Sequence, residues 1–73
     1  MHNLVDLDGV NIARGQCDGD STNLTICAAS GFEAKTGYFP AESITLNSIE
    51  AVKALSELCA LMITRHTELF PDL

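Results

Sequence analysis

A chain of 73 residues has room for one domain, and its core is marginal unless a disulfide, a metal or a second subunit adds to it. Hydrophobic residues make up 47% of the chain and charged residues 19%, a balance that excludes an intrinsically disordered protein. Ten acidic and four basic residues give a net charge of −6, which argues against binding to a nucleic-acid backbone, because that affinity comes from Lys and Arg displacing counterions. We therefore expect a single globular domain over residues 1–73.

The first half of the chain alternates between apolar and polar residues, as strands do. Residues 4–15 alternate on both sides of Gly9 and predict one bent strand or two short strands. Asp18-Gly19 is a hairpin signal, and residues 23–29 alternate again after it. That segment would carry Leu24, Ile26 and Ala28 on one face and Thr25, Cys27 and Ala29 on the other.

Two further strands are expected before the helix. A turn at Ser30-Gly31 leads into a predicted strand over residues 32–39, which Pro40 ends because proline cannot donate to a ladder. Residues 43–46 predict a last short strand that places Ile44 and Leu46 inward. Together these segments predict an antiparallel meander of three to four strands within residues 3–46.

The C-terminal third of the chain predicts one long helix over residues 48–68. Asn47 is the expected N-cap, with Glu50 three residues later as in a capping box. Strong helix formers follow, Arg65 and His66 suit the C-terminal end of the helix dipole, and Pro71 stops the pattern. The predicted fold is therefore α+β, an antiparallel three- to four-stranded meander followed by one long C-terminal helix packed on the sheet.

The apolar face of this helix is too wide for one supporting sheet. Projected at 100° per residue, its polar stripe is narrow and the apolar arc covers close to two-thirds of the circumference, whereas a helix on one sheet needs a little over 100°. We expect a homodimer through the helix, because cyclic dimers are the commonest oligomers. Two alternatives remain open: the strands curl round the helix within one chain, or a different partner binds. The predicted dimer interface is Leu58, Leu61, Met62 and Arg65.

No motif in the sequence predicts catalysis, a cofactor or a metal site. The segment from Asp18 begins like a calcium loop, but Asn23 and Ala29 stand where that loop needs glycine and glutamate. The three cysteines and two histidines lack the paired spacing of zinc ligands. Cys17 is the thiol expected to be exposed, and no base is placed beside it, so a redox or metal role through Cys17 is only a third hypothesis.

The preferred hypothesis is a non-enzymatic protein-interaction module. In size, acidity and element order the chain is similar to small accessory proteins of phages and mobile elements. Such a protein would inhibit a host nucleic-acid-handling or defence complex, in the manner of anti-CRISPR proteins, by occupying a basic surface of that complex. The acidic residues expected to make this contact are Asp6, Asp8, Asp18, Asp20, Glu33 and Glu42.

Two alternatives to this function stay open. One is a module for single-stranded nucleic acid, in which aromatic side chains of the sheet stack on bases beside the few basic residues. The residues concerned are Phe32, Tyr38 and Phe39, with Lys35 and Arg14. The other is a purely structural homodimeric domain. The first residues lack the pattern of a secretory signal, and the longest apolar run, residues 58–63, is too short for a membrane span, so we expect a cytoplasmic protein without a membrane partner.

Overall fold

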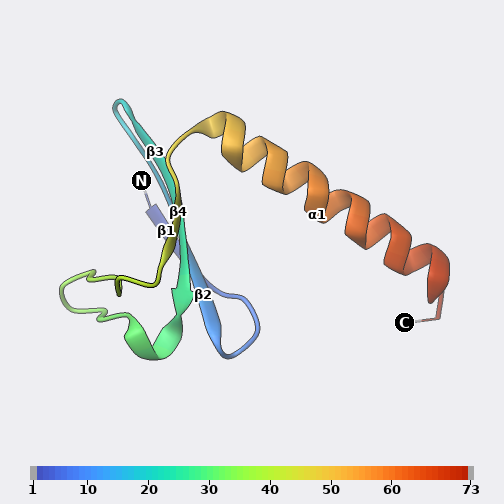
Figure 1. Ribbon diagram of the computed structural model, residues 1–73, viewed down its shortest axis with the longest axis horizontal. Helices are drawn as coiled ribbons and strands as arrows, with labels where there is room; N and C mark the ends of the chain where they lie inside the picture. The colour runs from blue at the N-terminus through green and yellow to red at the C-terminus, as the bar shows by residue number, and fades with distance from the viewer. Residues whose placement is uncertain (1, 73) are drawn as a thin grey trace.

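The computed structural model describes residues 2–72 and contains a four-stranded antiparallel sheet followed by one long helix (Figure 1). The strands lie in the sheet in chain order, so the predicted meander is confirmed with four strands. They are β1 (His2–Asp6), β2 (Asn11–Asp18), β3 (Ser21–Ala28) and β4 (Ile44–Leu46). A short 3-10 helix, η1 (Ala29–Gly31), follows β3, and the long helix is α1 (Ile49–Leu69).

Two turns set the register of the first three strands. Residues 4–15, predicted as one bent strand or two, contribute to two strands, β1 and β2, and residues 7–10 form the turn between them. The hairpin predicted at Asp18-Gly19 joins β2 to β3, where Asp18 pairs with Ser21 and leaves a two-residue turn. Gly19 has a φ of 52° in this turn, a left-handed conformation that glycine adopts without steric cost.

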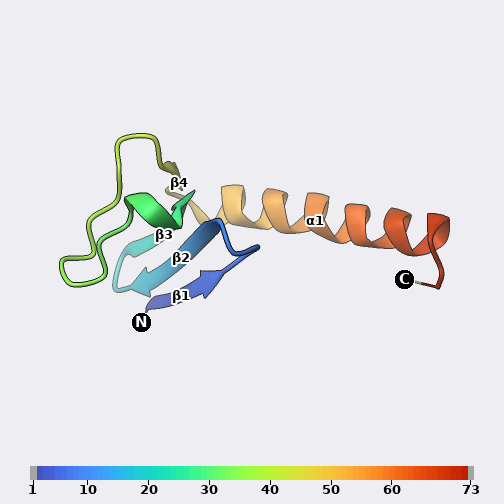
Figure 2. The ribbon, with the colours of Figure 1, turned by 90° about the horizontal axis from the view of Figure 1, so that it is seen from below.

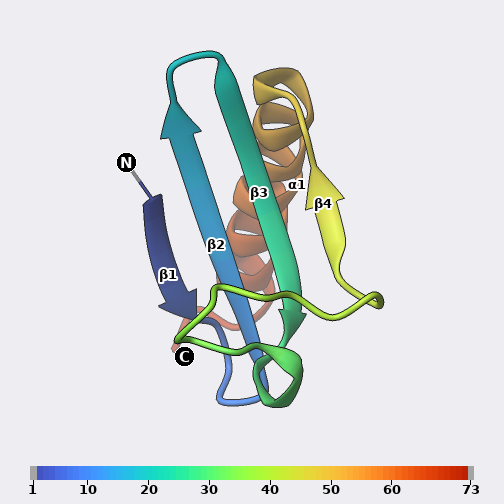
Figure 3. The same cartoon turned by 90° about the vertical axis from the view of Figure 1, so that its left-hand side faces the viewer.

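One face of the sheet is covered by the segment between β3 and β4, and we call it the loop face (Figure 3). The pairing register places Ile12, Arg14, Thr25 and Cys27 together on this face. The guanidinium carbon of Arg14 lies 4.5 Å from the centre of the Phe39 ring, which brings the covering segment onto the strands. Of the described residues, Ile12, Thr25 and Cys27 are the ones that are buried, so the core of the chain lies under this segment.

The opposite face of the sheet, which we call the helix face, carries the more apolar side chains. The register places Leu24 opposite Leu46 and Ile26 opposite Ile44 there, with Val5 on β1. The first turns of α1 contact this face, because Ile26, Ile44 and Leu46 line a common hollow with residues of the helix. Figure 3 shows α1 behind the strands, on the side away from the covering segment.

The strand predicted over residues 32–39 does not form. In its place the chain closes a loop on itself, in which the Glu33 N–H donates to the Tyr38 carbonyl (3.1 Å) and the Gly37 N–H donates to the Glu33 carbonyl (2.8 Å). Gly37 has a φ of 72°, which a regular strand does not allow. These backbone groups bond locally instead of to a ladder, and Phe32 and Phe39 turn toward each other, with ring centres 4.9 Å apart.

The helix begins one residue later than predicted, and its N-cap is Ser48 rather than Asn47. The Ser48 hydroxyl accepts a hydrogen bond from the Ala51 N–H (3.2 Å), and Ser48 has the extended backbone of an N-cap. The prediction of Asn47 was therefore wrong by one position. The predicted range of 48–68 otherwise agrees within one residue at each end with the observed helix, Ile49–Leu69.

The helix projects away from the sheet instead of lying along it (Figures 1 and 2). The radius of gyration of 14.3 Å exceeds the value of about 11 Å that is typical of a compact chain of this length. The sheet does not curl round α1, so the alternative in which the strands cover the wide apolar arc does not hold within the single chain. This geometry leaves two apolar surfaces open beside each other.

Candidate interaction surface

The helix α1 is supported by the sheet only over its first two turns. Ala51, Val52 and Leu55 are half-buried, whereas every described residue from Ser56 onward is exposed. A helix of this length gains most of its stability from packing of its apolar side, and the distal turns have no packing partner within the chain. The distal half of α1 is therefore the first candidate for a contact with another molecule.

The apolar side chains of α1 that face the sheet continue along the exposed part of the helix. Leu55, Leu58 and Met62 follow one another at spacings of three and four residues and so share one side of the helix. Leu58, Leu61 and Met62 are 53%, 61% and 62% exposed. The structure thus brings the predicted interface residues Leu58, Leu61, Met62 and Arg65 together on one stretch of α1, where the last three line a shallow hollow with His66, Leu69 and Phe70.

The helix face of the sheet meets this side of α1 in a second hollow, which is lined by apolar residues. Its lining residues come from β3, β4 and the first half of α1, and they are Ile26, Ile44, Leu46, Ala51, Ala54, Leu55 and Leu58. Leu58 of this hollow precedes Leu61 and Met62 of the first one by three and four residues, so the two hollows follow each other along one side of α1. We call this surface the apolar wedge. We define it by Ile26, Ile44, Leu46, Leu55, Leu58, Leu61 and Met62.

The more polar face of the sheet is the more deeply buried one. Thr25, on the loop face, is 4% exposed and shares a hydrogen bond with Thr45 (3.3 Å). Ile44, on the helix face, is 63% exposed, and Leu46 is half-buried. The expectation that Ile44 points inward was therefore wrong for the single chain, because α1 leaves the sheet before it covers β4. Burying a side chain such as Ile44 stabilises by about 1.5–3 kcal/mol, so this exposure is costly.

The six acidic residues predicted to contact a partner are all exposed but do not form one patch. Asp6 and Asp8 lie at the turn between β1 and β2, and Asp18 and Asp20 lie at the opposite end of β2, roughly 25 Å away at 3.4 Å per residue. Glu33 and Glu42 belong to the segment that covers the loop face.

Asp6 and Asp8 have a local structural role. The Asp6 carboxylate accepts a hydrogen bond from the Gly9 N–H (2.7 Å), and the Asp8 carboxylate accepts from the backbone N–H groups of Asn11 (2.7 Å) and Val10 (3.0 Å). The bond from the Asn11 N–H, followed by that from Val10 and one from the Asn11 side chain, lowers the pKa of Asp8 below its ordinary value. Both carboxylates shape the turn in which they lie.

The aromatic residues considered for base stacking are mostly engaged in covering the sheet. The rings of Phe32 and Phe39 pack against each other and are half-buried, and the Arg14 guanidinium lies over the Phe39 ring. Tyr38 is exposed, as is Lys35. The structure therefore does not present the three rings as one stacking platform.

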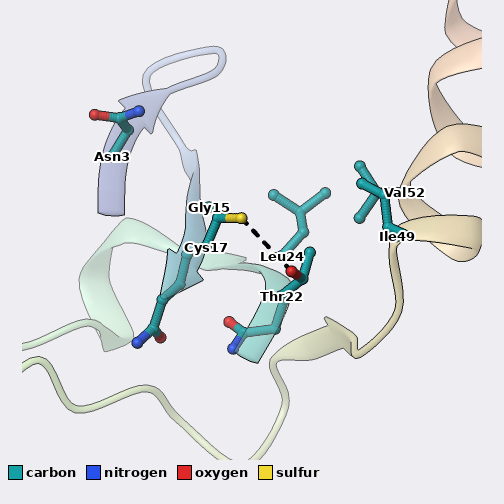
Figure 4. Close-up of a pocket in the computed structure, with 9 residues that line it drawn as sticks. Asn3, Gly15, Cys17, Thr22, Leu24, Ile49 and Val52 are labelled. Carbon is teal, nitrogen blue, oxygen red and sulfur yellow. Dashed lines mark hydrogen bonds between the residues drawn. The ribbon is translucent and has the colours of Figure 1, made fainter. Parts of the chain in front are cut away.

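Cys17 lies at the edge of a third hollow, between the hairpin and the start of α1 (Figure 4). Its sulfur lies 3.6 Å from the Thr22 hydroxyl, and across the hollow stand Leu24, Ile49 and Val52. Among the described residues that line this hollow there is no acidic residue, basic residue or histidine. His66 lies 17 residues into α1, about 25 Å along the axis from Ile49, so the structure does not bring it near Cys17.

Within residues 2–72, the His, Cys, Asp and Glu side chains nowhere gather in a group of three or more that could hold a metal ion. The described part of the chain also contains no helix with the length and hydropathy needed to span a membrane. No protein-family model matches the chain, and neither the curated proteins nor the solved structures contain a match to it.

Proposed function

We propose that this chain is a non-enzymatic protein-interaction module that binds through its apolar wedge. The observation that carries the proposal is the burial of the sheet: the buried residues lie on the more polar loop face, while Ile44 on the helix face and the distal half of α1 stay exposed. A large exposed apolar surface on a small domain is typical of a protein contact.

The character of the surface supports binding rather than chemistry. Leucine, isoleucine and methionine side chains dominate it, and its hollow beside the sheet has no polar lining side chain among the described residues. Such a surface is suited to burying the apolar side of another helix or sheet, as in helix-in-groove recognition. Arg65 stands at the distal end, where it could pair with an acidic group of the partner.

A pair of helix variants tests this function. Met62→Lys places a charge in the apolar wedge, and Thr64→Lys places the same charge two residues away, on the polar side of the helix. Both positions are exposed in the single chain, so neither change should disturb its fold. We expect Met62→Lys to weaken binding of a captured partner at least tenfold and Thr64→Lys to leave it unchanged. Equal binding by both variants and the wild type would refute a role for the wedge.

A more specific version of this function is inhibition of a host nucleic-acid-handling or defence complex, in the manner of anti-CRISPR proteins. Its support is the net charge of −6 together with the exposure of the six acidic residues. A single basic surface that contacts them all would have to extend along the whole sheet. If charge drives this contact, the association rate falls steeply as salt rises, and a rate independent of salt excludes this version.

A further inference from the structure

The chain exposes more surface than a folded monomer of its size. Its accessible surface is 5719 Å², whereas a compact protein of 7.8 kDa exposes about 4,400 Å². The difference, about 1,300 Å², exceeds the area of about 800 Å² that each partner buries in a standard interface. Two copies that buried this difference would form an interface of the size found in stable homodimers.

The two halves of the apolar wedge complement each other. The helix face of the sheet, with Ile26 and Ile44, needs an apolar cover, and the exposed side of α1, with Leu61 and Met62, is such a cover. Within one chain they diverge, because α1 leaves the sheet at its first turns (Figure 1). A twofold axis lets the helix of each copy cover the sheet of the other, since an isologous interface uses the same patch twice.

The distribution of charge permits two acidic copies to associate through this surface. Each copy has a net charge of −6, so like charges must stay outside the contact. At 100° per residue, Glu50, Glu57 and Glu68 form one stripe of α1 that borders the apolar wedge at Leu61. This stripe lies roughly 80–140° round the helix from Leu58 and Met62, so the acidic groups stand at the edge of the wedge and not at its centre. The hollow beside the sheet is lined by apolar residues alone. The side of α1 that would fill this hollow in the other copy is apolar as well.

We propose that a second copy of this chain occupies the apolar wedge, so that α1 of each copy lies against the helix face of the other's sheet. This inference rests on the proposed function and names a second copy of the chain as the partner of the wedge. It also assigns Ile44, a sheet residue, to the interface, and a contact between the helices alone would leave this residue exposed.

Two matched variants test the arrangement by size-exclusion chromatography with light scattering. Ile44→Lys charges the proposed interface at a side chain that is 63% exposed in the single chain. Val10→Lys makes the same change at a side chain that is 65% exposed, in the turn between β1 and β2 and outside the apolar wedge. We expect the wild type and Val10→Lys to have twice the mass of 7.8 kDa, and Ile44→Lys to dimerise at least about 30-fold more weakly.

The outcomes separate this inference from the proposed function. A wild type that stays at 7.8 kDa up to about 100 μM overturns the inference, and so does an Ile44→Lys variant that remains as dimeric as Val10→Lys. Far-UV circular dichroism of both variants shows whether they are folded. If Ile44→Lys does not fold, the urea midpoint of the wild type decides, because only a dimer becomes more stable as its concentration rises. A monomer that still loses a captured partner through Met62→Lys leaves the proposed function intact.

Discussion

The N-cap of α1 offers a sharp test of how the helix is positioned. Ser48→Ala removes the hydroxyl that accepts from the Ala51 N–H at 3.2 Å, and Asn47→Ala changes the neighbouring residue that the capping pattern favoured. Losing a serine N-cap costs about 1 kcal/mol in the free energy of unfolding. For a domain of this size that corresponds to a decrease of roughly 4–8 °C in Tm. Because the distal turns of α1 have no packing within the chain, little else compensates for the loss.

Urea unfolding followed by circular dichroism at 222 nm measures both variants, at one protein concentration so that association does not alter the comparison. We expect Ser48→Ala to lose about 1 kcal/mol and Asn47→Ala to change stability by less than about 0.5 kcal/mol. The reverse order, with Asn47→Ala the more damaging change, would refute the assignment of Ser48 as the cap and with it the direction in which the helix leaves β4.

The remaining predictions concern the turns and glycines. Gly31→Ala should destabilise the protein by about 1–3 kcal/mol in urea unfolding, because a Cβ there would lie 2.9 Å from Cγ of Pro40, and an unchanged midpoint would contradict this contact. Gly15→Ala, in the middle of β2 with nothing within 4 Å of a new Cβ, should stabilise a single chain by about 0.5–1 kcal/mol, and a loss of that size would contradict the open space. The hydrogen bonds from Asn11 and Val10 lower the pKa of Asp8 in the folded state below its ordinary value of 3.8. The stability that they provide is therefore fully present above pH 3.8 and is lost as the pH falls through the lowered pKa. The advantage of the wild type over Asp8→Asn in urea unfolding should therefore shrink below pH 3.8, and an advantage that grows there would contradict the account.

Local patterns predict much of this fold because the elements concerned are stabilised within a few residues. The β2–β3 hairpin follows from Asp18-Gly19, where one glycine supplies the left-handed φ that the turn needs. The helix range follows from its composition and periodicity, which are also local. The error at the cap is small because Asn47 and Ser48 are both good N-cap residues, and only the backbone geometry distinguishes them.

The failures have a common tertiary origin. Residues 32–39 have the alternation of a strand, but the Phe32 and Phe39 rings pack on each other, and Phe39 also packs on Arg14, in a segment that does not pair in a ladder. The same covering segment buries Thr25 and leaves Ile44 exposed, which the alternation of β3 and β4 does not reveal. The projection of the apolar arc does identify the candidate surface on α1. It does not show that the helix face of the sheet belongs to the same surface, because that depends on the angle at which α1 leaves the sheet.

Hydrogen exchange of the α1 backbone tests the central claim, that the apolar wedge is a binding surface, most directly. In an isolated chain, the amides of residues 58–69 belong to helical turns without tertiary packing and exchange rapidly. If the wedge binds a second copy, their protection rises at least about tenfold between about 1 μM and about 100 μM protein, and Met62→Lys abolishes the rise while Thr64→Lys preserves it. Exchange of these amides that stays fast at every concentration in the wild type, with or without its captured partner, would contradict the claim.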